Sequence, residues 1–161
     1  MAGVKEGYGK LDYGNGDVYI GQWKSDKVRC CSVAWRPLVK LTLVAQRHGW
    51  GLFYSPVEGK YEGYWANDLR EGPGRMEYLN GNFYDGSWKR GQWSGRGLLK
   101  CAHGGVASYE GEWSEGLIHG KGHLVYRTGD SFVGHFKDNQ VRCRVHCNRV
   151  CGIAVCTLGD D

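Results

Sequence analysis

The sequence predicts an all-β protein: an elongated, single-layer antiparallel sheet of consecutive β-hairpins, with an irregular insert and an irregular C-terminal tail. Two short motifs, each built around glycine, alternate along most of the chain. Glycine contributes 27 of the 161 residues but proline only 3, a balance that fits neither a collagen-like chain nor a proline-rich disordered one. A repeating pattern therefore places the glycines.

The first motif, aromatic-x-Gly-x-aromatic, occurs five times. Its members are Tyr19, Gly21 and Trp23; Tyr61, Gly63 and Trp65; Tyr84, Gly86 and Trp88; Tyr109, Gly111 and Trp113; and Phe132, Gly134 and Phe136. Successive side chains of a strand point to opposite faces, so the three defining residues of each copy share one face. Each copy is expected to form one short strand with a single apolar face.

The second motif is Gly-x-Gly followed by an aliphatic or aromatic residue, and it lies between the copies of the first. Its glycines are Gly7 and Gly9; Gly49 and Gly51; Gly72 and Gly74; Gly95 and Gly97; and Gly120 and Gly122. Turn signals such as Asn15-Gly16 and Asn80-Gly81 separate it from the next aromatic motif. Each repeat is therefore expected to contribute two strands.

One repeat is too long, because Trp23 and Trp65 are 42 residues apart where the later units are spaced by 23 or 25. Removing the 19 residues 28–46 restores both this period and the distance from Trp23 to the next Gly-x-Gly. The removed segment opens with Val-Arg and closes with Gln. Codons for these residues can contain the bases that stand at the two ends of a typical intron. We interpret residues 28–46 as translated intron, and the alternative is a genuine insertion loop.

The repeat pattern holds through Gln140, and Cys143 stands where the period requires glycine. The cysteine-rich segment 141–161 again opens with Val-Arg, which suggests intron read-through, and the alternative is a genuine tail. The predicted organisation is one array of about five repeats over residues 5–140, interrupted by the insert 28–46 and followed by the tail 141–161.

These alternating motifs resemble the MORN repeat (membrane occupation and recognition nexus), and the resemblance covers residues 5–140 apart from the insert. It implies a single sheet in which each hairpin covers the aromatic stripe of the one before. Ser55, Cys101 and Phe136 depart from the usual residues at their positions. Repeat-only chains of this type are similar to ciliary radial-spoke head and cytoskeletal assembly proteins. Other family members are linked to phosphoinositide membranes, or precede phosphatidylinositol-phosphate kinase or histone-lysine methyltransferase domains.

Charge gives little support for an anionic partner. The whole chain has a net charge of +4, but the repeat body outside residues 28–46 and 141–161 holds 15 basic and 15 acidic residues. A neutral body without a basic cluster argues against nucleic acid and makes an anionic lipid surface the second choice. We expect unidentified protein partners, and the sequence does not indicate an oligomeric state.

No residue set predicts catalysis, a cofactor or a metal site. The tail cysteines at 143, 147, 151 and 156 lack the Cys-x-x-Cys spacing of common zinc modules. The periodic Gly-x-Gly does not match the G-x-G-x-x-G of a phosphate loop. The start lacks a signal peptide, and the longest apolar run, Leu38–Ala45, is too short to cross a bilayer. We expect a cytoplasmic protein with reduced thiols, at the cytoskeleton or cilium if the resemblance holds.

The leading functional hypothesis is a non-catalytic protein–protein interaction or scaffold module. Trp50, Tyr64 and Trp93 are the candidate partner contacts, as aromatic residues expected to lie off the apolar stripe. One alternative is a phosphoinositide or membrane-surface module. The other is the accessory repeat part of a truncated phosphatidylinositol-phosphate kinase or histone-lysine methyltransferase.

Overall fold

The structure is a computed structural model that describes residues 6–27 and 43–142. Most of the expected insert, residues 28–42, and most of the expected tail, residues 143–161, lie outside the described residues. The described residues form one antiparallel sheet in which each strand pairs with its neighbours in sequence. The strands are β1 (Gly7–Asp12), β2 (Val18–Lys27), β3 (Leu43–Ser55), β4 (Gly59–Ala66), β5 (Leu69–Tyr78), β6 (Phe83–Lys89), β7 (Gln92–Lys100), β8 (Val106–Ser114), β9 (Leu117–Tyr126), β10 (Ser131–Lys137) and β11 (Gln140–Arg142).

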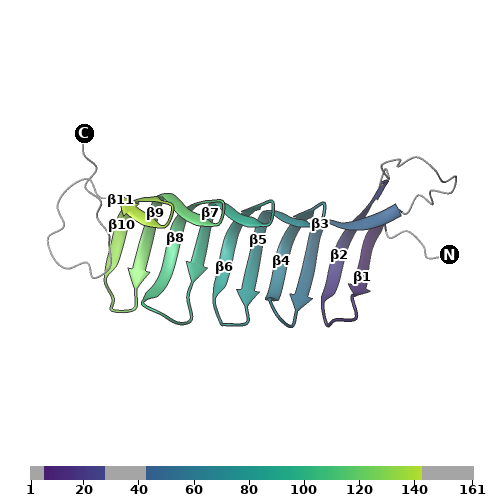
Figure 1. Ribbon diagram of the computed structural model, residues 1–161, viewed down its shortest axis with the longest axis horizontal. Helices are drawn as coiled ribbons and strands as arrows, with labels where there is room; N and C mark the ends of the chain where they lie inside the picture. The colour runs from purple at the N-terminus through teal and green to yellow at the C-terminus, as the bar shows by residue number, and fades with distance from the viewer. Residues whose placement is uncertain (1–5, 28–42, 143–161) are drawn as a thin grey trace, which may run out of the picture.

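The sheet is an elongated ribbon with β1 at one end and β11 at the other (Figure 1). Each strand pairs with the next one along the chain, and the order of the described strands contains no crossover. The predicted fold class, an all-β single-layer array of hairpins, is confirmed.

The structure moves the inner boundaries of both irregular segments. Residues 43–46, expected to end the insert, form the start of β3 and pair with residues 24–27 of β2. Residues 141–142, expected to open the tail, belong to β11 and pair with β10. In both places the added residues give backbone N–H and C=O groups of the preceding strand a hydrogen-bonding partner.

The sheet is continuous across the position of the insert. Trp23 pairs with Arg47 across β2 and β3 in the same way that Trp65 pairs with Arg70 across β4 and β5. The Tyr19 ring packs edge-on against the Trp65 ring of the next repeat, with their centroids 5.7 Å apart. The described strands β2 and β3 therefore keep the register of the other repeats.

A row of paired glycines runs across the sheet from β1 to β10. Each glycine lies opposite a glycine of the next strand; in order they are Gly9, Gly21, Gly51, Gly63, Gly74, Gly86, Gly97, Gly111, Gly122 and Gly134. A Cβ on Gly63 would lie 2.5 Å from the Cα of Gly74 and 2.6 Å from the Tyr61 hydroxyl oxygen. From Gly21 to Gly122 these positions exclude larger residues because a tyrosine ring occupies the space, whereas a Cβ on Gly9 would lie 3.7 Å from Trp23, an ordinary contact.

One face of the sheet, which we call the ring face, carries the core. Its aromatic side chains are almost fully buried and include Tyr19, Trp23, Tyr61, Trp65, Tyr84, Trp88, Tyr109, Trp113 and Phe136. Each tyrosine packs edge-on against the tryptophan or phenylalanine of its own repeat and of the next; the Tyr84 centroid lies 5.3 Å from Trp88 and 5.5 Å from Trp113. Edge-to-face pairs of this kind stabilise beyond the area that they bury. Neighbouring repeats therefore interlock through their rings.

Hydrogen bonds hold the polar ends of these rings. Each buried tyrosine hydroxyl donates to the backbone carbonyl three residues later, as Tyr84 does to Ser87 at 2.9 Å. Three of the buried indoles donate to a glycine carbonyl of the preceding repeat, as Trp88 does to Gly74 at 2.9 Å. Burial raises the pKa of the Tyr19 and Tyr109 phenols to about 12 and also raises the pKa of Tyr61 and Tyr84.

The first glycine of each Gly-x-Gly has a different role from the second. Gly72 has a φ of 74° and lies where β5 has more residues than the facing segment of β4, so the register shifts between Gly63 and Trp65. The same register shift recurs in the other long hairpins. Such bulges bend and twist a strand, and the strand ends above the glycine row curve across the top of the sheet in Figure 1.

Tight turns that the sequence analysis did not recognise connect the strands beyond each bulge. Both central residues have positive φ in each turn, which is the geometry of a type I′ hairpin. The central pairs are Asn67 and Asp68, Arg90 and Gly91, Glu115 and Gly116, and Asp138 and Asn139. The second residue of each pair donates its N–H to a carbonyl in the second strand of the preceding hairpin, at 2.9 to 3.2 Å; the acceptors are Arg47, Arg70, Trp93 and Ile118. The turns therefore also stack from one repeat to the next.

Candidate functional site

The face opposite the rings, which we call the open face, carries the side chains that the core does not use. Its side chains come from the positions on either side of each glycine in the row. They form two lines that cross the strands, and the backbone of the glycine row lies between them. This pattern leaves a trough that runs along the array.

Exposed aromatic side chains gather on the open face over the first four strands. Trp50 and Tyr64 lie directly opposite each other across β3 and β4, with 39% and 49% of their surfaces exposed. Tyr8 of β1 and Tyr54 of β3 are also exposed. The partly buried Ile20 and Leu52 pair beside them across β2 and β3. Aromatic groups exposed on a flat sheet are typical of protein interfaces.

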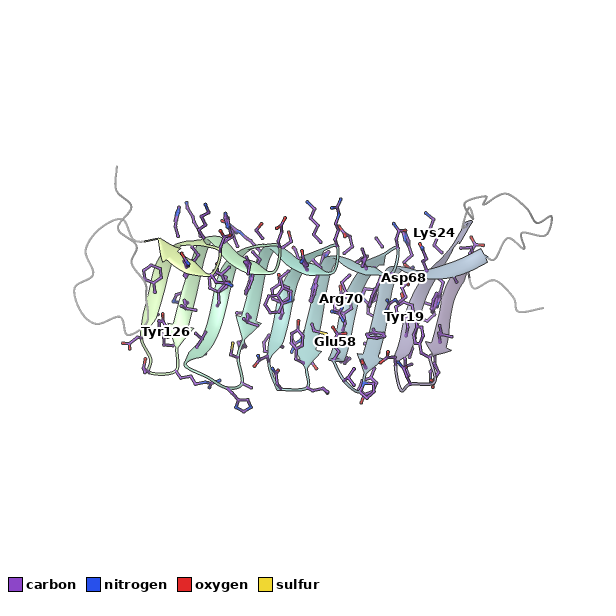
Figure 2. The ribbon with its side chains drawn as sticks, in the orientation of Figure 1. Tyr19, Lys24, Glu58, Asp68, Arg70 and Tyr126 are labelled. Atoms are coloured by element: carbon purple, nitrogen blue, oxygen red, sulfur yellow. The ribbon has the colours of Figure 1, made fainter. Side chains whose placement is uncertain are left out.

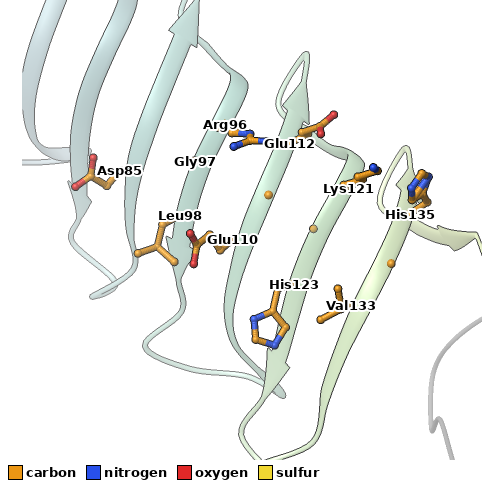
Figure 3. Close-up of a pocket in the computed structure, with 13 residues that line it drawn as sticks. Asp85, Arg96, Gly97, Leu98, Glu110, Glu112, Lys121, His123, Val133 and His135 are labelled. Atoms are coloured by element: carbon orange, nitrogen blue, oxygen red, sulfur yellow. The ribbon is translucent and has the colours of Figure 1, made fainter.

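The open face over the last strands is charged and hollowed. A shallow groove with a volume of about 670 Å³ spans β6 to β10, and the glycine row forms its floor. Arg96, Glu112, Lys121 and His135 line one side, and Asp85, Leu98, Glu110, His123 and Val133 line the other (Figure 3). The open face therefore changes along its length from aromatic to charged.

Trp93 is not on the open face, and its expected position off the apolar stripe was wrong. Its ring stacks on Tyr84 with centroids 4.7 Å apart and an interplanar angle of 12°, and it packs edge-on against Trp113 at 4.9 Å. Trp93 lies opposite Trp88 across β6 and β7, beyond the register shift, and this pairing places it on the ring face. Trp93 thus contributes to the core, whereas Trp50 and Tyr64 lie together at the surface.

The ring face carries a polar cluster built from two arginines at equivalent positions of neighbouring repeats. The Arg47 guanidinium lies 4.1 Å from the centre of the Trp65 ring and pairs with Asp68 at 3.1 Å. Arg70 pairs with Glu58 at 2.6 Å and lies 5.1 Å from the Tyr61 ring; Figure 2 labels Arg70, Glu58 and Asp68 in this part of the sheet. Both arginines are thus paired with carboxylates of neighbouring segments, and they stabilise the stacked repeats.

The histidines and the remaining cysteine form no candidate centre in the described part of the chain. His119 lies 3.6 Å from Asp138 in the last turn, whereas His123 lines the groove of the open face. Cys101 is the free cysteine among the described residues and is partly buried. No group of three or more His, Cys, Asp or Glu in residues 6–27 and 43–142 is placed to hold a metal ion. The tail cysteines lie outside the described residues.

The described strands include no helix of the length and apolarity needed to span a bilayer.

The comparison with protein families agrees with the repeat geometry. The MORN repeat model matches residues 1–18, 61–83, 84–106 and 109–131, more than half of the chain. The last three matches each begin at the tyrosine of an aromatic motif. Residues 19–60, which contain the interrupted repeat, are not among the matched ranges, although β2 and β3 keep the common register. The fold and the matched repeats define a hairpin-repeat protein.

The chain belongs to the MORN repeat family. Its membership places it among proteins whose repeats generally serve as modules that interact with proteins or membranes. Among the described residues, the open face carries both the exposed aromatic pair Trp50 and Tyr64 and the charged groove.

Proposed function

We propose that this chain is a non-catalytic protein–protein interaction or scaffold module that binds its partner through the open face. The observation that carries the proposal is the exposed pair Trp50 and Tyr64, which lies next to a trough floored by glycine. Large aromatic side chains are the residues that most often dominate the binding energy of a protein interface.

The rigid frame beneath the surface supports the proposal. Trp50 lies on β3 and Tyr64 on β4, and these strands are paired over residues 49–55 and 59–65. The backbone N–H of Trp50 donates to the Gln22 side-chain oxygen of β2 at 3.0 Å, which ties it to the preceding strand as well. A preorganised surface loses little conformational entropy when a partner binds.

A membrane-surface function has less support from charge. Attraction to anionic lipid requires clustered Lys and Arg near the surface, and the aromatic half of the open face carries Glu62 beside Tyr64. The groove over β6 to β10 mixes both signs of charge. We therefore place protein binding ahead of lipid binding.

The experiment is crosslinked affinity capture from a cell extract with the full chain, comparing wild type with the Trp50→Ala, Tyr64→Ala double variant. The matched control is Val57→Ala, Leu79→Ala, because both side chains are exposed but lie in the turns after β3 and β5. We expect specific protein partners to be lost from the open-face variant and kept by the control. Equal capture by the two variants would reject the open face as the binding surface.

A parallel vesicle-flotation assay tests the membrane alternative. Salt-sensitive binding of the full chain to vesicles with phosphatidylserine or phosphoinositide, but not to neutral vesicles, would favour the lipid function instead. The accessory-domain alternative is tested by reading the gene downstream of the tail for a kinase or methyltransferase domain. The cytoskeletal or ciliary setting stays a prediction, tested by imaging the tagged chain in ciliated cells.

A further inference from the structure

The two ends of the sheet expose the two halves of the contact that joins neighbouring repeats within it. Inside the array, the aromatic ring that opens each motif covers two glycines of the row, one on its own strand and one on the next strand. The Tyr109 ring, for example, lies against Gly111 and Gly122, where an ideal Cβ would overlap its hydroxyl group. Each ring is therefore completed by a glycine from the strand that follows it.

The last ring of the row lacks that second strand in the part of the chain that the structure describes. Phe132 lies against Gly134 of its own strand. Beyond it, β11 pairs only with residues 135–137 of β10, which leaves residues 131–134 without a described strand on that side. Phe132 is accordingly only partly buried, whereas the tyrosines at the four equivalent positions are fully buried.

The first glycine of the row has the opposite deficit, because β1 pairs only with β2 among the described strands. A Cβ on Gly9 would meet the Trp23 ring at 3.7 Å and no ring of a preceding strand. Leu11 on the same strand is partly exposed, whereas Met76 at the equivalent position of β5 is fully buried. Since β1 and β10 lie toward opposite ends of the ribbon in Figure 1, one end has an uncovered ring and the other an empty ring slot.

The strands at the two ends also complete each other. Val141 of β11 pairs with Phe136 as Arg70 of β5 pairs with Trp65, so β11 corresponds to the start of β5. β1 begins at the first glycine of a Gly-x-Gly motif and corresponds to the remainder of β5. Together, β11 of one chain and β1 of another make up one long strand of the repeat.

We propose that copies of this chain join head to tail, with β1 of one copy pairing with residues 131–134 of β10 in the next. Gly134 then lies opposite Gly9 and Phe132 opposite Leu11, as the equivalent residues of β4 and β5 do within the chain. The Phe132 ring fills the slot over Gly9. Because β11 already fills the first part of that strand, the incoming copy joins only through β1.

The new contact continues the contact between repeats and does not involve the open face. Strands at the edge of a sheet readily pair with another chain, and side chains packed across neighbouring strands stabilise the pair. Since the two surfaces differ, each added copy presents the same end again, and the contact builds an open row. β11 and β1 share one of the eleven strand positions, so each copy adds ten strands, or about 48 Å.

Gly9→Ala tests this contact with little effect on the single chain. The added methyl group makes only an ordinary contact there, and the Gly9 backbone is not left-handed. In the row of copies, the methyl group would overlap the Phe132 ring of the neighbouring copy. Gly105→Ala is the matched control, because no atom lies within 4 Å of its methyl group. Urea titration checks that the two variants unfold at the same midpoint.

Sedimentation equilibrium of the full chain measures the association, with a reducing agent present so that disulfides do not contribute. One strand pair is smaller than a standard interface, so we expect a dissociation constant on the order of 0.1 mM. The average mass of the wild type and of Gly105→Ala should rise with concentration. Gly9→Ala should associate at least about tenfold more weakly, because overpacking opposes the contact.

Mixtures of wild type with excess Gly9→Ala test the direction of the contact. The variant keeps an intact β10, so it should accept β1 of one wild-type chain and form a species of two chains. Equal association of Gly9→Ala and Gly105→Ala, as a two-fold pairing of β10 with β10 would give, would overturn the proposal. The absence of the mixed species would overturn it too. A wild-type chain that stays single across the concentration range would do so whatever the variants show.

Discussion

A methyl group added to the glycine row tests how the repeats interlock. An ideal Cβ on Gly86 would lie 2.5 Å from the Cα of Gly97, 2.6 Å from the Tyr84 hydroxyl oxygen and 2.7 Å from the Arg96 carbonyl oxygen. Since carbon atoms are normally separated by about 3.5 to 4.0 Å, either β7 or the Tyr84 ring has to move by about 1 Å in Gly86→Ala.

The free-energy cost follows from these contacts. Overpacking typically costs about 1 to 3 kcal/mol, and displacing the Tyr84 hydroxyl from the Ser87 carbonyl adds about 1 kcal/mol. The lower chain entropy of unfolded alanine offsets about 0.5 to 1 kcal/mol of this. We expect Gly86→Ala to lower the free energy of unfolding by about 2 to 3 kcal/mol.

Gly105→Ala is the matched control, because no atom lies within 4 Å of the added methyl group and the Gly105 backbone is not left-handed. It should change the free energy of unfolding by less than about 0.5 kcal/mol, or raise it slightly. Urea titration followed by tryptophan fluorescence measures both variants. An unfolding midpoint for Gly86→Ala equal to that of Gly105→Ala would refute the close packing of ring over glycine.

Four further predictions concern single features of the array. Tyr109→Phe removes the hydroxyl that donates to the Glu112 carbonyl at 3.1 Å and should lower the free energy of unfolding by about 1 kcal/mol in the same titration; an unchanged value would mean that the bond contributes nothing net. Arg90→Asn should raise the free energy of unfolding by about 0.5 kcal/mol, because Arg90 has a φ of 50° in a type I′ turn that favours asparagine. A lower melting temperature of this variant would contradict the prediction. Burial raises the folded-state pKa of Tyr19 and Tyr109 to about 12, whereas tyrosine in the unfolded chain ionises near pH 10. The stability from these buried tyrosines is therefore full below about pH 10 and falls as the pH rises toward 12. An unfolding midpoint that stays flat from pH 9 to 11.5 would exclude the effect. Deletion of residues 28–46 joins Lys27 to Arg47, so that Ser25 and Asp26 take the turn positions that Asn67 and Asp68 occupy in the next repeat. It should leave the midpoint unchanged, and a large loss of stability would show that this segment supports the array.

The positions of the rings and of the glycine row could be predicted from the sequence, because strand alternation alone assigns them to a face. Tyr61, Gly63 and Trp65 share a face, and the equivalent residues of every described repeat occupy the ring face as expected.

The bulges and the turns beyond them could not be read from alternation. Gly72 and Gly74 appear equivalent in the sequence, yet one supplies a positive φ and the other leaves room for a ring. The extra residues at each bulge hide the type I′ turn, although Asn67-Asp68 is a recognisable signal for it. Trp93 was misassigned because it lies beyond the bulge of β7.

The candidate site was predicted only in part. Trp50 and Tyr64 were identified as surface aromatic residues, but their direct pairing depends on the register of β3 and β4. The charged trough was missed, because Asp85, Leu98 and Glu110 belong to three strands and become neighbours only once the register of the sheet is known.

The account depends most on an unbroken row of glycines that passes the position of the insert. A nuclear Overhauser experiment on glycine-labelled protein tests this directly, since Gly21 and Gly51 lie opposite each other across β2 and β3. We predict a cross-peak between their α-protons, as for Gly63 and Gly74 in an uninterrupted repeat. A cross-peak for Gly63 and Gly74 with none for Gly21 and Gly51 would show that the array is broken between β2 and β3.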